Sequence, residues 1–113
     1  MGTGLTIHIE EERDLTVFRI DGRLDASNAP LLERKLREMM DGGKSKILLD
    51  FAKVDYLSSA GMRVLLWATK TLNESGHLAI TLIGEEVMEI IKMAGFDTIL
   101  HIYATEQKAI DAF

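Results

Sequence analysis

Short apolar runs alternate along this chain with amphipathic stretches at helical spacing, and this order constrains the fold more than any other feature. The first two runs, Thr6 to Ile9 and Leu15 to Ile20, flank a polar turn, as in a β-hairpin. Each of three later runs follows a helical stretch, and a last helical stretch ends the chain. Strands joined by helical crossovers normally pair in parallel. The order predicts an α/β fold with an N-terminal hairpin, a mostly parallel mixed sheet and about four helices.

The predicted elements after the hairpin have recognisable ends. They are a helix that begins near Ser27, Asn28 and Pro30 and ends at Gly42-Gly43, a strand at Ile47 to Leu49, a helix from the Ser58-Ser59 pair to about Glu74, a strand at Leu78 to Ile83, a helix closed by Gly95, a strand at Leu100 to Tyr103 and a helix capped by Thr105. We expect the last helix to direct Ala109, Ile110 and Phe113 towards the core.

Length and charge limit the possible functions. The 113 residues suit one domain, residues 1–113, large enough to bury roughly two thirds of its unfolded surface. A net charge of -5 without a basic block disfavours binding to nucleic acid or to anionic membranes. The absence of cysteine excludes disulfides, thiolate catalysis and cysteine-ligated metals. Neither a signal peptide nor an apolar stretch long enough to span a bilayer is evident, so we expect a cytoplasmic protein without direct membrane insertion.

Two serines, Ser58 and Ser59, lie where an apolar strand meets an amphipathic helix. The first amides of a helix lack intrahelical partners, so a serine there can cap the backbone or hold a phosphate. Capping explains only one of the two. A phosphoryl group would add about -1.5 to -2 charges, which an exposed helix N-terminus favours by about 0.3–1 kcal/mol. We therefore expect phosphorylation here to switch binding and to leave folding intact.

Two further residues near this junction allow both a structural and a functional interpretation. On a helical wheel, Trp67 and Arg63 lie nearly opposite the apolar face that Met62 and Leu65 share, so Trp67 is expected to point away from the core. It either packs against a neighbouring segment or contacts a partner. Asp25 follows a strand and either caps the first helix or its turn, or has a functional role.

The residues do not favour catalysis or metal binding. The segment around Ser59 lacks the glycine two residues before the nucleophile that the sharp turn of an α/β-hydrolase requires. None of His8, His77 and His101 has the context of a catalytic base or the spacing of metal ligands. The sequence therefore predicts no cofactor, no metal and no enzyme activity, and the detection of ester hydrolysis lost in Ser59→Ala would revive the enzyme hypothesis.

Several motifs, in a fixed order, resemble the STAS domain of bacterial anti-sigma-factor antagonists. They are Gly22-Arg23-Leu24-Asp25-Ala26, Ala29-Pro30, Leu49-Asp50, the stretch Val54 to Leu65, then Ala94-Gly95-Phe96, Ile102-Tyr103, Thr105-Glu106 and Ala109. The resemblance covers nearly the whole chain, and the ordered combination is far more specific than any single motif.

The resemblance implies a partner-switching protein. When unphosphorylated, such a protein binds an anti-sigma factor that is also a serine kinase, and the sigma factor is released for transcription. The kinase uses ATP to phosphorylate the serine of an Asp-Ser-Ser/Ala-Gly motif, and a metal-dependent serine phosphatase restores the binding form. Alignment through Gly61 places the phosphoacceptor at Ser59 and the acidic position at Ser58. That departure from the pattern leaves Ser58 as the alternative acceptor.

The resemblance also implies a partner surface. It matches Asp25 to the family's acidic residue near the phosphorylation site, and it adds Ser58, Gly61 and Arg63 as neighbours of Ser59. The helical wheel, and not the family, adds Trp67. A competing hypothesis is a constitutive interaction subunit that docks on a transporter ATPase or a larger sensory assembly, with Ser59 serving only as a cap.

Overall fold

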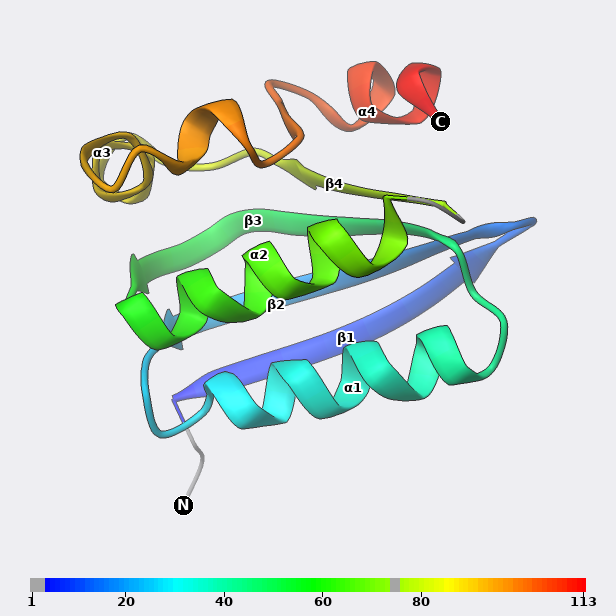
Figure 1. Ribbon diagram of the computed structural model, residues 1–113, viewed down its shortest axis with the longest axis horizontal. Coiled ribbons are helices and arrows are strands. Elements are labelled where there is room, and N and C mark those ends of the chain that lie inside the picture. The colour runs from blue at the N-terminus through cyan, green and yellow to red at the C-terminus, as the bar shows by residue number, and fades with distance from the viewer. Residues whose placement is uncertain (1–3, 74–75) are drawn as a thin grey trace.

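The computed structural model describes residues 4–73 and 76–113 (Figure 1). Within these ranges the chain forms one sheet, four α-helices and a short 3-10 helix. In order they are β1 (Leu5–Glu12), β2 (Leu15–Leu24), α1 (Ala29–Asp41), β3 (Lys46–Leu57), α2 (Ser59–Leu72), β4 (His77–Thr81), α3 (Glu85–Met93), η1 (Phe96–Thr98), β5 (Ile102–Tyr103) and α4 (Glu106–Ala112).

The strands lie in the order in which they occur in the sequence, β1-β2-β3-β4-β5. Strand β1 pairs with β2 antiparallel, whereas the pairs β2–β3, β3–β4 and β4–β5 are parallel. This arrangement confirms the predicted α/β fold, with its N-terminal hairpin and its mostly parallel mixed sheet.

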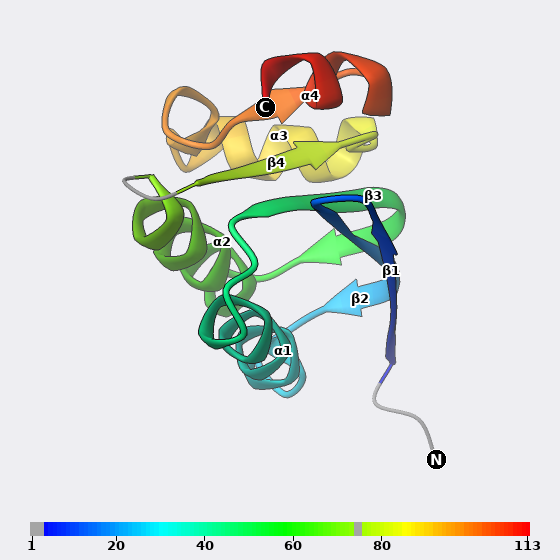
Figure 2. The same cartoon turned by 90° about the vertical axis from the view of Figure 1, so that its right-hand side faces the viewer.

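The two faces of the sheet carry different side chains because alternate residues of a strand point to opposite sides. Phe18 of β2 and Leu49 of β3 are fully buried on the face covered by α1, α2 and α3. Helices α1 and α2 lie side by side against this face (Figure 2). Val17 and Leu48 point to the other face, where they pack against Ala109 of α4 in a smaller cluster. The main core therefore lies beneath α1, α2 and α3.

An arginine on that second face fastens α4 to the sheet. Arg19 of β2 forms ion pairs with Glu10 of β1, Asp50 of β3 and Glu106 in the first turn of α4. The hydrogen bond to Glu106 is the chief cause that raises the pKa of Arg19. These polar partners explain how α4 is held over a small apolar cluster.

Two strands differ from the sequence prediction in length. Strand β4 ends at Thr81 and does not reach Ile83, because Leu82 adopts a left-handed conformation with φ 60° and leaves the extended path of the strand. Strand β3 is longer than predicted and continues to Leu57. Strand pairing with β2 up to Leu24 accounts for this extension.

The chain end also differs from the prediction. Strand β5 begins only at Ile102, because η1 occupies the segment just before Leu100. Ala109 is buried and Phe113 is half-buried as expected, but Ile110 is 38 % exposed and does not face the core. A helix of seven residues contacts the sheet along too narrow a line to bury three apolar side chains. Helix α2 ends at Leu72, and the predicted end near Glu74 lies outside the described residues.

Candidate functional site

Two strand-to-helix turns lie side by side at the carboxyl ends of β2 and β3. Strands β2 and β3 are parallel and end in register, Leu24 beside Leu57. The backbone N–H of Ser58 donates to the carbonyl of Leu24, with a nitrogen-to-oxygen distance of 2.9 Å. Helices α1 and α2 consequently begin at the same end of the sheet (Figure 1). This contact brings the Asp25 turn beside the Ser58-Ser59 pair, as the sequence hypothesis requires.

Ser58 is the N-cap of α2. Its backbone is extended, with φ -85° and ψ 169°, and its Oγ accepts a hydrogen bond of 3.1 Å from the N–H of Gly61. The Ser58 carbonyl accepts from the N–H of Met62. The side chain is half-buried. Ser58 therefore has the structural role that the sequence assigned to one of the two serines.

Ser59 differs from its neighbour. It is the first residue of α2 and its side chain is exposed. Within the described part of the chain its hydroxyl takes part in no hydrogen bond. The first turn of α2 also contains no acidic side chain. Ser59 thus presents its hydroxyl to solvent at the positive end of the helix dipole.

Gly61 allows this turn to pack closely on the sheet. It is buried, and a Cβ placed on it would lie 2.8 Å from Cγ of Leu24 and 2.8 Å from Cδ1 of Leu57. Real Cβ atoms do not approach other atoms so closely. Gly61 therefore lets the start of α2, with its two serines, lie close to Leu24 and Leu57, and it contributes no exposed surface itself.

The neighbouring turn satisfies its polar groups internally. One carboxylate oxygen of Asp25 accepts from the hydroxyl and the N–H of Ser27, at 2.7 Å and 3.0 Å, and from the N–H of Asn28 at 3.2 Å. The hydrogen bond from the Ser27 hydroxyl, with help from these backbone donors, lowers the pKa of Asp25. The capping interpretation of Asp25 is therefore correct for this turn, and its surface role stays a prediction.

The side chain of Asn28 holds the same turn by hydrogen bonds to the backbone. It occupies the N-cap position of α1 and is 1 % exposed, yet its side chain makes no capping bond to the helix. Its Oδ1 accepts from the N–H of Asp25, and its Nδ2 donates to the carbonyl of Arg23. The sequence placed Asn28 at the start of this helix but gave no sign of these two hydrogen bonds, which depend on the fold of the turn.

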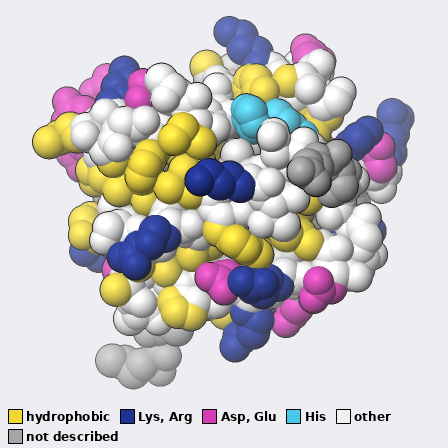
Figure 3. Space-filling model, in the orientation of Figure 1, with side chains coloured by type: hydrophobic (Ala, Val, Ile, Leu, Met, Phe, Trp, Pro, Cys, Tyr) yellow, Lys and Arg dark blue, Asp and Glu magenta, His cyan; other side chains and the backbone are white. Residues whose placement is uncertain are grey.

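A shallow groove separates α1 from α2 next to Ser59. Its volume is about 480 Å³. The residues that line it are Ala26, Ala29, Pro30 and Glu33 on one side and Ala60, Arg63, Val64 and Trp67 on the other. Hydrophobic patches and charged groups alternate on the face that carries these helices (Figure 3). The groove is thus an amphipathic surface at the proposed site.

Trp67 lies in this groove and is only half-buried. The guanidinium carbon of Arg37 on α1 lies 4.3 Å from the centre of the indole, and Nε of Arg37 donates to Glu33 at 3.1 Å. Of the two alternatives for Trp67, packing against a neighbouring segment is confirmed. The expectation that the side chain points away from the core was wrong, because Trp67 also packs against the main core, and a wheel of one helix contains no information about α1. The side chain packs against a neighbouring helix and also lines the groove.

The three histidines lie away from the serines in the structure. His77 and His101 stack with their ring centres 4.4 Å apart, and Nε2 of His77 lies 3.3 Å from the Tyr103 hydroxyl. Burial is the main cause, and His101 the second, that lowers the pKa of His77. His8 is exposed on β1, beside Glu10. These contacts give His77 and His101 a role in packing and leave His8 on the surface.

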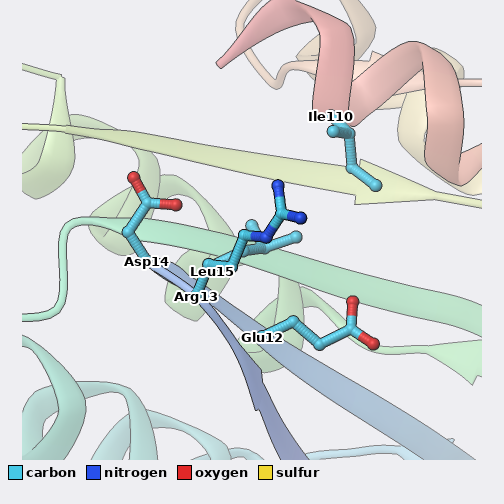
Figure 4. A pocket seen from close by; sticks show the side chains of 5 residues that line it. All are labelled: Glu12, Arg13, Asp14, Leu15 and Ile110. Atoms are coloured by element: carbon cyan, nitrogen blue, oxygen red, sulfur yellow. The ribbon is translucent and has the colours of Figure 1, made fainter.

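A larger hollow of about 600 Å³ lies at the hairpin turn. Glu12, Arg13, Asp14, Leu15 and Ile110 line it, and the charged side chains point in different directions (Figure 4). Because they do not converge on a common point, they do not form a ligand site. Among the described residues, no group of three or more histidine, cysteine or acidic side chains is arranged to hold a metal ion.

A protein-family model described as the STAS domain matches residues 6–109. The chain belongs to the STAS domain family. Its sequence is 33 % identical to BtrV of Bordetella bronchiseptica, a protein named as an anti-sigma factor antagonist, over 88 % of this chain and 93 % of BtrV. This membership confirms the resemblance found in the sequence.

Solved structures share the fold. An anti-sigma factor antagonist from Mycobacterium paratuberculosis has a TM-score of 0.87 and 22 % identity, over 96 % of this chain and 92 % of that chain. The Bacillus protein SpoIIAA in its unphosphorylated form has a TM-score of 0.77 and 22 % identity, over 95 % of both chains. Its phosphorylated form has a TM-score of 0.71 and 21 % identity, over 95 % of this chain and 98 % of that chain.

Within the described residues of the present chain, no helix has both the length and the apolar character needed to cross a membrane.

Proposed function

We propose that this protein is a cytoplasmic anti-sigma-factor antagonist that works by partner switching. In its unphosphorylated form it binds an anti-sigma factor with serine kinase activity, so that a sigma factor is released. Phosphorylation of Ser59 with ATP ends this binding, and a metal-dependent serine phosphatase restores it. The observation that carries the proposal is the exposed, uncommitted hydroxyl of Ser59 beside a neighbour that already caps the helix.

The division of labour between the serines favours Ser59 as the acceptor. For Ser58 to reach a kinase, its half-buried hydroxyl must give up its bond to the N–H of Gly61. Loss of such a cap costs about 0.5–2 kcal/mol. Ser59 requires no such rearrangement. Ser58 is the weaker candidate acceptor for this reason.

The surroundings of Ser59 explain how one phosphoryl group can control binding. The groove between α1 and α2 is lined by Ala29 and Pro30 of α1 and by Ala60 and Trp67 of α2, and Ala60 directly follows Ser59. A partner that buries this surface must also desolvate whatever Ser59 carries. Burial of a dianion without a matched cation costs several kcal/mol, and 4.1 kcal/mol corresponds to a thousandfold change in Kd. We propose Asp25, Ser58, Ser59, Arg63 and Trp67 as the partner-facing residues around this groove, with Gly61 beneath them.

The phosphorylation step has a direct test. The purified protein is incubated with its cognate anti-sigma kinase and ATP, and the modified residue is located by mass spectrometry. Ser59→Ala should abolish modification, whereas the matched variant Ser58→Ala should still be modified at Ser59. Phosphate found elsewhere, with Ser59→Ala still able to switch partners, would overturn the assignment.

The binding step can be followed with a natural probe. Trp67 is the single tryptophan of the chain and lines the groove, so its fluorescence should change when the partner docks. Ser59→Asp should weaken binding by tenfold or more without a comparable fall in thermal stability. Equal affinity of the wild-type protein and Ser59→Asp, together with co-purification of a transporter ATPase, would instead support the constitutive-subunit hypothesis.

A further inference from the structure

Arg63 lies one helical turn after Ser59 on α2. It follows Ser59 by four residues on α2, so the two side chains lie on the same face of the helix, with Cβ atoms about 5–6 Å apart. Arg63 is exposed and lines the groove together with Ala60 and Trp67. The side chain of Arg63 is long enough for its guanidinium to reach a phosphoryl group on the hydroxyl of Ser59.

Two other arginines near this groove, Arg23 and Arg37, already have partners. Arg37 is held by Glu33 and by the ring of Trp67, and the guanidinium of Arg23 lies over Tyr56. In the described part of the chain, Arg63 forms neither an ion pair nor a ring contact. It is therefore the cation of the groove that is available to a new anion.

We propose that Arg63 is the intramolecular counter-ion of phosphorylated Ser59, an inference that rests on the proposed function. An anion four residues before a cation is the favourable order on a helix. The helix dipole also favours the phosphate, which lies at the N-terminal end of α2. Arginine can donate two parallel hydrogen bonds to one phosphoryl group, which lysine cannot do. The first turn of α2 has no carboxylate that would compete for Arg63.

This pairing changes the nature of the switch. In the unphosphorylated protein, Arg63 is free to contact an acidic group of the partner in the groove. After modification, the phosphate adds negative charge to the surface and also withdraws this positive charge from the partner. One covalent change then removes an attraction and introduces a repulsion. Arg63 acts here as a positioning residue for the phosphate and a specificity residue for the partner.

The test uses phosphoserine installed at position 59 during translation, so that neither kinase nor partner is needed. The 31P chemical shift is followed against pH to obtain the second pKa of the phosphate, which is about 6 in the absence of partners. Arg63→Gln should raise this pKa by about 0.2–0.4 of a pH unit, the size expected for an exposed pair at this spacing. Arg63→Lys should give an intermediate value.

The matched control is Lys70→Gln, which removes another exposed cation of α2. It lies eleven residues from Ser59, about 16 Å along the helix and beyond the reach of a screened charge at physiological salt. The 31P titration of this variant should equal that of the parent. Equal midpoints for Arg63→Gln and Lys70→Gln would overturn the proposal.

A second measurement separates this proposal from the proposed function. The ratio of the Kd values of phosphorylated and unphosphorylated protein for the anti-sigma factor should fall at least threefold in Arg63→Gln relative to Lys70→Gln. An unchanged ratio would overturn the role of Arg63 in switching, even if Ser59 is the phosphoacceptor. Failure of the kinase to modify Ser59 would instead refute the proposed function and would leave the 31P result intact.

Discussion

The Asp25 turn and the Ser58 turn are built on the same plan but are used differently. Both connect a parallel strand to the first turn of a helix, at the same edge of the sheet. In the first, Asp25, Ser27 and Asn28 bond to one another and to the backbone. In the second, Ser58 caps the helix and Ser59 is left with no internal partner among the described residues.

The difference shows how a small domain can carry a modifiable group without losing stability. A hydroxyl that closes a turn costs stability when it is modified or removed. A hydroxyl beside a capped and tightly packed turn can change its charge while the fold persists.

Gly61→Val should destabilise the protein by about 2–3 kcal/mol, because overpacking of this size must displace Leu24 and Leu57 beneath the Ser58 turn. Urea denaturation measures the loss. The control is Gly84→Ser, at a position where a Cβ meets no described atom within 4 Å. Equal stability of Gly61→Val and Gly84→Ser would show that the close packing of α2 is not required.

Asn28→Ala should cost about 2 kcal/mol, because the backbone N–H of Asp25 and the carbonyl of Arg23 lose the partner that the buried Asn28 side chain gives them. Ser27→Ala, at an exposed position in the same turn, is the control and should cost much less. Chemical denaturation of both variants measures the difference. If Asn28→Ala is as stable as Ser27→Ala, the hydrogen bonds of Asn28 to the backbone of this turn do not stabilise the protein.

Ser58→Ala should lower the free energy of unfolding by about 1 kcal/mol, the usual value of an N-cap. Ser59→Ala should change it by less than about 0.5 kcal/mol, as is usual for exposed positions. Thermal and urea denaturation of the two variants provide the comparison. A cost for Ser59→Ala that matches that of Ser58→Ala would contradict the separation of capping from signalling.

Asp25→Asn should show the smallest effect, and one that depends on pH. The folded pKa of Asp25 lies below its ordinary value of 3.8, so its contribution to stability is present above that value and is lost as pH falls through the folded pKa. The stability difference between wild type and Asp25→Asn should therefore shrink between about pH 5 and pH 2. Urea denaturation over this range measures it.

Introduction of Asp25→Asn in a Ser27→Ala background tests the cause of this pH dependence. The Ser27 hydroxyl is the largest cause of the lowered pKa, so its removal should reduce the pH dependence attributable to Asp25. An unchanged pH profile in this background would place the stabilisation of the carboxylate elsewhere.

Local pattern was sufficient for much of the fold. The alternation of apolar runs predicted the hairpin, the parallel sheet and the helices, and the ordered set of motifs from Gly22 to Ala109 indicated the family. Prediction failed where neighbours decide the outcome. Leu82 ends β4 early, and Ile110 faces solvent, because the path of the backbone and the narrow contact of α4 are not encoded in apolar spacing alone.

For the site, the sequence by itself determined that two hydroxyls stand at the start of an amphipathic helix, because residue type and spacing fix helix ends locally. Only the tertiary structure decided which hydroxyl is engaged and which is exposed. That choice depends on strand β2 ending beside Ser58 and on the closeness with which Gly61 packs against Leu24 and Leu57. Such contacts join residues far apart in the chain, and no local pattern specifies them.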